Sequence, residues 1–177
     1  LKPLMLDYQS NSVAKLAQYS KILNNKYVVK DSTLLLIDLG YTSANVTILE
    51  NGAIQLTRVL KYREGAMVGI DTDLLMMPDI FLKPEDSQRV FKNVIGNFIK
   101  ANVIEGMEDL IRYYTSQDQG ENIDAILLYG GLSHITGIEE VFFDYFNIPT
   151  TVWRDVVGVF MRTDMSKYLN CIGSLIT

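Results

Sequence analysis

The segment with the clearest chemical potential is an aliphatic run, residues 34–37, that ends in Asp38-Leu39-Gly40. A continuous apolar run of this length is typical of a strand that is covered on both faces. A carboxylate at the end of such a strand can hold a hydrated Mg²⁺ ion. Gly40 lets the chain turn, and Thr42 and Ser43 offer hydroxyl or backbone donors to a phosphate. The same pattern also fits an ordinary turn from a strand into a hairpin.

A second apolar run, residues 125–129, ends in Gly130-Gly131. Paired glycines leave bare backbone that a flat ring or a phosphate can approach closely. An adenosine could lie there, with Ser133 as the cap of a following helix. The alternative is a tight crossing from strand to helix that merely needs room. A nucleotide cleft requires both strand ends in one place, so we expect Asp38 and Gly130 to converge in space.

Other residues with chemical potential have simpler interpretations. His134 is the only histidine, and the sequence offers no partner for it, so we expect a surface loop residue. Asp71 and Asp73 fit helix capping better than metal binding. Cys171 is the only cysteine, which excludes an intramolecular disulfide and favours a reducing compartment. We expect its side chain to be a small buried hydrophobe.

Composition limits the class of protein. The chain has 177 residues, of which 48% are hydrophobic, enough for one globular domain or two small lobes. A net charge of -5 and the lack of lysine or arginine runs argue against a nucleic-acid surface. No apolar run approaches the roughly 20 residues that span a bilayer. The sequence starts at Leu1 without an initiating methionine, so we expect a piece of a longer protein.

Periodicity predicts the elements that position these segments. Strands and helices alternate, with one hairpin around Asn51-Gly52, so we expect an α/β fold with a mixed sheet flanked by helices. The predicted strands are 33–38, 44–49, 53–60, 125–129 and 150–153. Four helices are predicted. The first starts at Ser10 or Ser12 and has one apolar face, made of Val13, Leu16, Ala17 and Leu23, and the second runs from Pro84 to about residue 118 with a break at Gly96 or Gly106. The third lies near 136–146, and the fourth covers 166–176 with Leu169, Ile172 and Leu175 facing inward.

The two glycine turns, in this order, resemble motifs of the actin-like ATPase superfamily. Residues 38–43 (DLGYTS) resemble its second phosphate motif, and residues 126–138 (ILLYGGLSHITGI) resemble its adenosine motif. Within the superfamily the chain is most similar to the PilM family of type IV pilus assembly proteins, which is related to FtsA. The hairpin around Asn51-Gly52, residues 111–117 and residues 170–173 support the resemblance, which covers essentially the whole chain.

The resemblance implies an actin-like (ribonuclease H-like) fold with a small helical/β subdomain inserted. Residues 1–31 would belong to the first lobe or to the inter-lobe connection. Residues 32–64 and 120–155 would form the core of the second lobe, 65–119 the inserted subdomain, and 156–177 a closing helix.

The resemblance also implies a ligand. The intact protein would bind ATP and Mg²⁺ between two lobes, with the metal held through water by Asp38. It assigns the remaining contacts to Gly40, Thr42 and Ser43 for the phosphates, and to Gly130, Gly131 and Ser133 for the adenosine. It identifies no catalytic residue, and we expect little or no ATPase activity from this chain.

By the same resemblance, the partner is a cytoplasmic peptide of a PilN-like membrane protein, along with other pilus assembly proteins. The protein would then lie in the cytoplasm at the inner face of the membrane, with no membrane insertion of its own. Three alternatives remain: an FtsA-like cell-division protein, a sugar kinase, and a nucleotide-free scaffold of a secretion system. The scaffold gains support from Tyr41, since this position is small in strongly hydrolysing members and a tyrosine there would crowd a phosphate.

Overall fold

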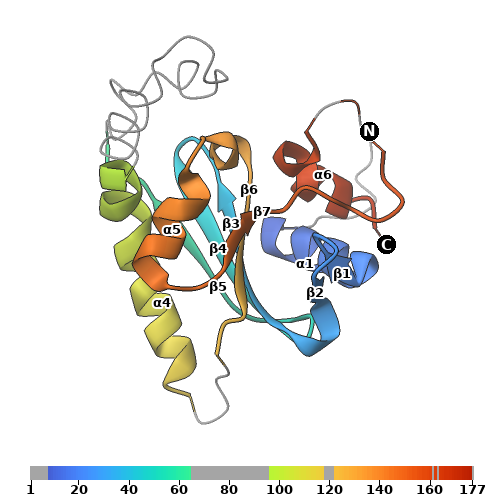
Figure 1. Cartoon of the computed structure of the whole chain (residues 1–177), viewed down its shortest axis with the longest axis horizontal. Helices are drawn as coiled ribbons and strands as arrows, with labels where there is room; N and C mark the ends of the chain where they lie inside the picture. The colour runs from blue at the N-terminus through green and yellow to red at the C-terminus, as the bar shows by residue number, and fades with distance from the viewer. Residues whose placement is uncertain (1–7, 65–95, 118–121, 161, 163, 177) are drawn as a thin grey trace.

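The computed structural model of this protein describes residues 8–64, 96–117, 122–160, 162 and 164–176 (Figure 1). Asp71, Asp73 and the start of the long helix expected from Pro84 lie outside these ranges. The domain boundaries proposed from the sequence therefore stay predictions. In the described part of the chain, no helix combines the length and the apolar character needed to cross a membrane.

A mixed five-stranded sheet forms the centre of the fold, in the order β5-β4-β3-β6-β7. Strand β3 pairs with β4 antiparallel and with β6 parallel, and β6 pairs with β7 parallel. The strands are β3 (Thr33–Leu39), β4 (Ser43–Glu50), β5 (Ala53–Lys61), β6 (Ala125–Tyr129) and β7 (Thr150–Val152). This arrangement confirms the predicted α/β fold with a mixed sheet.

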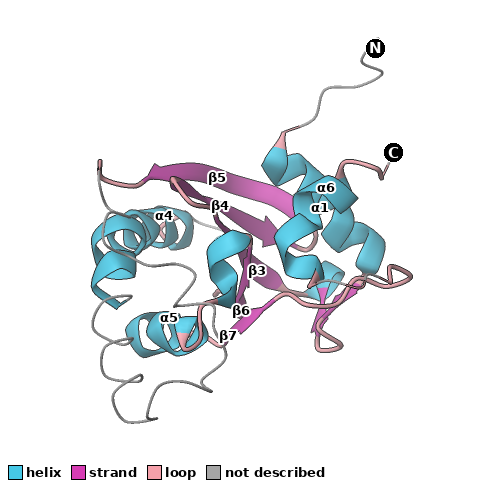
Figure 2. Ribbon diagram, turned by 90° about the horizontal axis from the view of Figure 1, so that it is seen from above, coloured by secondary structure: helices cyan, strands magenta, loops and turns pink. Residues whose placement is uncertain are grey.

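Helices cover both faces of the sheet (Figure 2). On one face lie α4 (Glu105–Thr115) and α5 (Ile138–Phe146), against which Leu35 and Ile37 pack. On the other face lie α1 (Gln9–Ser20) and the short α6 (Leu169–Gly173), with Leu34 and Leu36 beneath them. Alternate residues of a strand point to opposite faces. Every residue of β3 is therefore buried, as its continuous apolar run predicts.

The turn at Asn51-Gly52 joins β4 to β5 with positive φ at both residues, 52° and 82°. This conformation suits a two-residue hairpin whose strands twist in the right-handed sense. The predicted hairpin is thus confirmed at its turn. The break predicted at Gly96 or Gly106 is not found in the described residues, because Gly106 lies inside α4 and a π-helical turn at Lys100–Ile104 leads into that helix without interruption.

Two predicted helices need correction, and so does the expected burial of Leu175 and Cys171. Helix α1 ends at Ser20, because Lys21 has a φ of 62°, and Leu23 lies instead in the short strand β1 (Ile22–Leu23), which pairs with β2 (Tyr27–Val28). The helix expected near 136–146 is confirmed as α5, which begins after Gly137, whose φ is 80°. The last helix is a 3₁₀ turn (Met165–Tyr168) followed by five residues of α6. Leu175 lies beyond it and is 81% exposed, and Cys171 is exposed as well.

Helices α1 and α6 pack closely where Gly173 faces the backbone of Ser12. A Cβ atom at Gly173 would overlap the carbonyl group of Ser12, so this crossing needs a glycine.

Strand β7 is the border strand of the sheet, and side chains bind both peptide groups of its residue Val152. The N–H of Val152 donates to the Glu139 carboxylate at 2.6 Å, and the carbonyl of Val152 accepts from the Asn24 amide at 2.7 Å.

Candidate functional site

The carboxyl ends of β3 and β6, two adjacent central strands of the sheet, lie side by side. Asp38 pairs with Tyr129 in the parallel register, so Gly130 follows directly beside the carboxylate. A Cβ atom on Gly130 would overlap Asp38 Oδ1 and lie 2.9 Å from the Leu39 carbonyl oxygen. Gly130 also has a φ of 90° and a ψ of 179°, a region that is essentially restricted to glycine. The expected convergence of the two strand ends is confirmed.

The Asp38 carboxylate is nearly enclosed, with an exposed fraction of 8%. Its Oδ2 accepts a hydrogen bond of 2.7 Å from the Asn170 amide in α6. Burial raises the pKa of the Asp38 carboxyl, and the hydrogen bond from Asn170 opposes that rise. The oxygen of the same Asn170 amide is buried without a hydrogen-bond partner. Asn170 was not among the site residues predicted from the sequence.

A tight turn carries the chain from Asp38 into β4. The N–H of Gly40 donates to the Ser43 carbonyl at 3.1 Å, and a Cβ on Gly40 would lie 2.9 Å from that oxygen. The side chain of Tyr62 donates to the Gly40 carbonyl at 3.1 Å. Burial, together with the negative charge of Asp38, raises the pKa of the Tyr62 hydroxyl, so Tyr62 remains a donor. Tyr62 is a second site residue that the sequence did not reveal.

The side chains of this turn are open to a ligand. Tyr41 is 62% exposed, and Thr42 is exposed beside it. Ser43 is half-buried as the first residue of β4. The phosphate contacts predicted for Gly40, Thr42 and Ser43 therefore stay predictions that the exposure of this turn permits.

The second glycine of the pair leads into a 3₁₀ turn, Gly131–His134. Gly131 is exposed, and a Cβ there would meet no atom within 4 Å. Ser133 is only 1% exposed, and its hydroxyl donates to the Gly130 carbonyl at 2.8 Å. The expectation that Ser133 caps the following helix is wrong. Its hydroxyl closes the 3₁₀ turn, and α5 begins after Gly137 without a side-chain cap.

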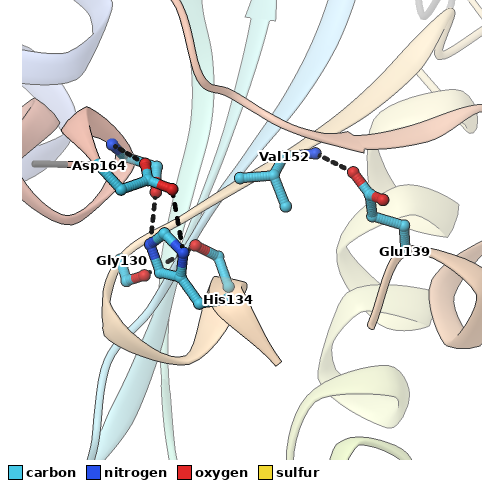
Figure 3. A network of polar contacts seen from close by, with 7 residues as sticks. Gly130, His134, Glu139, Val152 and Asp164 are labelled. Atoms are coloured by element: carbon cyan, nitrogen blue, oxygen red, sulfur yellow. Dashed lines mark hydrogen bonds and ion pairs between the residues drawn. The ribbon is translucent and has the colours of Figure 1, made fainter. Parts of the chain in front are cut away.

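His134 is not the surface loop residue expected from the sequence. Its Nε2 lies 2.7 Å from Ser166 Oγ, and its Nδ1 lies 3.2 Å from Asp164 Oδ2 (Figure 3). The side chain is only 16% exposed. In the neutral ring, Nδ1–H donates to Asp164 while Nε2 accepts from the Ser166 hydroxyl, a tautomer assigned from these partners.

The order serine, histidine, aspartate has the form of a nucleophile with its base. Ser166 is completely buried, however, so no substrate carbonyl can reach its hydroxyl in this structure. The Ser166 carbonyl also accepts from the Gly130 N–H at 3.0 Å. These contacts join the segment that precedes α6 to the paired-glycine turn, and their role here is structural.

Burial lowers the pKa of His134, and Lys167 and Arg154 lower it further, while the neighbouring Asp164 raises it. The net direction of the pKa shift is downward, so the ring favours the neutral form in the folded chain.

Among the described residues, no group of at least three histidine, cysteine or acidic side chains is arranged to hold a metal. Tyr129, the residue before Gly130, is buried and packs edge-on against Trp153, with the two ring centroids 6.4 Å apart.

Comparison with known proteins finds similarity in three-dimensional structure. No family model and no curated protein matches the chain. It matches a chain of the PilM–PilN type IV pilus biogenesis complex with a TM-score of 0.58 and 18% identity, covering 98% of this chain and 52% of that one.

Other actin-fold structures match over most of this chain. The activator of 2-hydroxyisocaproyl-CoA dehydratase from Clostridium difficile, solved with bound ADPNP, gives a TM-score of 0.52 at 13% identity over 94% of this chain and 63% of its own. An archaeal actin homologue gives 0.51 at 12% identity over 93% and 52%. The fold is therefore actin-like, and the chain spans about half the length of these proteins, 52–63%.

We expect Gly130→Ala to destabilise the chain strongly, because its methyl group would overlap Asp38 and its backbone conformation disfavours any side chain. The free energy of unfolding should fall by about 3 kcal/mol in urea denaturation. Gly131→Ala is the matched control, since its Cβ meets nothing within 4 Å, and it should change stability by less than about 0.5 kcal/mol. Equal effects of the two variants would contradict the observed contact.

We expect His134 to make the chain less stable in acid. Its folded pKa lies below the unfolded value, so the unfolded chain binds more protons between the two pKa values. This contribution is complete above the unfolded pKa and is lost as the pH falls toward the folded one. Urea midpoints measured at about pH 7.5 and about pH 5.5 should fall more steeply for the wild type than for His134→Gln. Parallel profiles would refute this assignment.

Proposed function

We propose that this chain is the second lobe of a PilM-type, actin-fold protein that binds ATP between two lobes. The contact of Asp38 with Gly130 carries the proposal, because it places a carboxylate beside the paired-glycine turn, in which Gly130 is buried and Gly131 is exposed. Ligands of open α/β sheets bind outside the carboxyl ends of the strands. The match to an ADPNP-bound activator of the same fold supports a nucleotide as that ligand.

Asp38 is the proposed holder of Mg²⁺, through water molecules. The donor set fits this ion, because a carboxylate and the unpaired, buried oxygen of Asn170 lie on adjoining side chains. Both are hard oxygen groups that accept hydrogen bonds from the water shell that Mg²⁺ retains in proteins. When bound, the ion neutralises phosphate charge beside the lobe.

The exposed turn after β3 is the proposed phosphate contact, through the backbone of Gly40 and the hydroxyls of Thr42 and Ser43. Gly130 and Gly131 are the proposed contacts for the adenosine. Ser133 acts indirectly, because its buried hydroxyl donates to the Gly130 carbonyl and is not free for a ligand.

No residue is assigned to catalysis, and the role we propose is that of a switch. A nucleotide that contacts two lobes favours their closed arrangement by its differential affinity for it. Closure would then alter the surface offered to a partner. The proposed partner is the cytoplasmic peptide of a PilN-like membrane protein, together with other pilus assembly proteins. Such a partner would hold the protein at the inner face of the cytoplasmic membrane.

A nucleotide-free scaffold is the second candidate, and the enclosure of Asp38 favours it. The carboxylate is 8% exposed and already accepts a hydrogen bond from Asn170. The exposed ring of Tyr41 adds bulk beside the predicted phosphate site. Under this alternative, Asp38 would serve only to join β3 to α6.

We expect Asp38→Ala to weaken Mg-ATP binding by about tenfold or more, since it removes a charge-assisted contact. The measurement is calorimetric titration of the full-length protein that contains this chain. Asp109→Ala, which removes an exposed carboxylate in α4, should bind like the wild type. With EDTA in place of Mg²⁺, wild type and Asp38→Ala should differ little. Identical Mg-ATP affinities would reject the role of Asp38, and no binding by the wild type would favour the scaffold.

We expect the full-length protein to bind the N-terminal cytoplasmic peptide of a PilN-like protein. Titration of a fluorescently labelled peptide should give saturable binding, while a peptide of the same composition in scrambled order should not bind. Binding should respond to Mg-ATP if closure of the lobes reaches the partner surface. Failure of both peptides to bind would remove the PilN-like partner while leaving the nucleotide proposal intact.

A further inference from the structure

The Asn170 amide is only half satisfied. Its Nδ2 donates to Asp38 Oδ2 at 2.7 Å, whereas its Oδ1 is buried and accepts no hydrogen bond. A buried acceptor without a donor costs free energy, and such groups in native proteins call for an explanation. A donor that arrives beside Asp38 would supply one.

The bound state proposed above brings such donors. Water molecules in the shell of a divalent cation are strong hydrogen-bond donors, and Mg²⁺ keeps several of them when it binds to protein. The unpaired Asn170 oxygen belongs to the same planar amide that contacts the carboxylate, so it lies close to Asp38. Among the described residues, no lysine or arginine forms an ion pair with Asp38 that would compete with a cation.

We propose that Asn170 is a positioning residue that transmits the binding of a hydrated divalent cation at Asp38 to helix α6. The inference rests on the proposed nucleotide function of this site. The Nδ2 group holds the carboxylate in place, and Oδ1, which is buried in the cation-free chain, would accept from a water of the cation once the Asn170 side chain turns toward it. Binding of the cation would thereby add a hydrogen bond to α6 that the cation-free protein lacks.

The surroundings of α6 determine how far this effect reaches. The segment before it is tied to the paired-glycine turn, through Gly130 to the Ser166 carbonyl and through His134 to Asp164. The far end of α6 contacts α1 where Gly173 meets Ser12. Residues 164–173 thus contact both strand ends of the site and helix α1, which covers the same face of the sheet as α6. An added hydrogen bond at Asn170 would therefore stabilise this whole segment.

Hydrogen exchange of the full-length protein tests the proposal. We compare a non-hydrolysable ATP analogue with saturating Mg²⁺ against the same analogue with EDTA. In the wild type, Mg²⁺ should slow exchange of the α6 amides about fivefold, the factor expected for one net hydrogen bond. Asn170→Leu removes both amide groups and should lose this slowing. Ser174→Ala, which removes a hydrogen bond at the end of α6 and leaves Asp38 untouched, should retain it.

A second variant acts in the opposite direction. Asn170→Asp places another carboxylate beside Asp38, which repels it without a cation and adds a ligand oxygen with one. Its Tm should be lower than that of the wild type in EDTA and should rise more on addition of Mg²⁺ with the analogue. This result would separate a cation-dependent role from a purely structural one.

The outcomes distinguish this inference from the function on which it rests. If calorimetry finds no Mg-nucleotide binding to the wild type, both are overturned. If the wild type binds but α6 shows no Mg²⁺-dependent slowing, or if Asn170→Leu slows equally, only the role of Asn170 is overturned. Should Asn170→Leu fail to fold, Asn170→Asp decides, and a Tm response to Mg²⁺ equal to that of the wild type overturns the proposal.

Discussion

The arrangement of this protein depends on one close approach, between the Asp38 side chain and the backbone of Gly130. The parallel pairing of β3 with β6 fixes it, since Asp38 stands opposite Tyr129 and the next residue has no space for a Cβ atom. The same approach forces Gly130 into a conformation that other residues rarely adopt. A buried carboxylate and a buried glycine backbone are thereby held together at the carboxyl ends of two central strands of an actin-like sheet.

Contacts around this pair come from segments far away in the sequence. Asn170 reaches Asp38 across 132 positions, and Ser166 reaches His134 across 32. Tyr62 binds the Gly40 carbonyl from the far end of the hairpin. The site is therefore an assembly of two strand ends and the segment before and within α6. Its geometry depends on how α6 packs against α1 as much as on the strands themselves.

The parts of this assembly that the sequence predicts are those governed by local rules. Continuous apolar runs predict β3 and β6, and Asn51-Gly52 predicts the hairpin, because each signal acts over a few residues. The convergence of Asp38 with Gly130 follows from placing two such strands side by side. Asn170, Tyr62 and the partners of His134 escape prediction, because nothing local marks an amide or a serine as the neighbour of a distant carboxylate or imidazole. The short α6 reflects a 3₁₀ turn before Leu169 that periodicity does not encode.

The two hydrogen bonds at Val152 have a consequence for assembly. Strand β7 forms one border of the sheet, and a border strand with unpaired peptide groups is a template for pairing with another chain. Here the peptide groups of Val152 are already engaged by Glu139 and Asn24, so a strand from a neighbouring molecule finds neither donor nor acceptor at that residue. The sheet is therefore closed to extension past β7 at Val152, whereas β5, the strand at its other border, is not protected by these contacts.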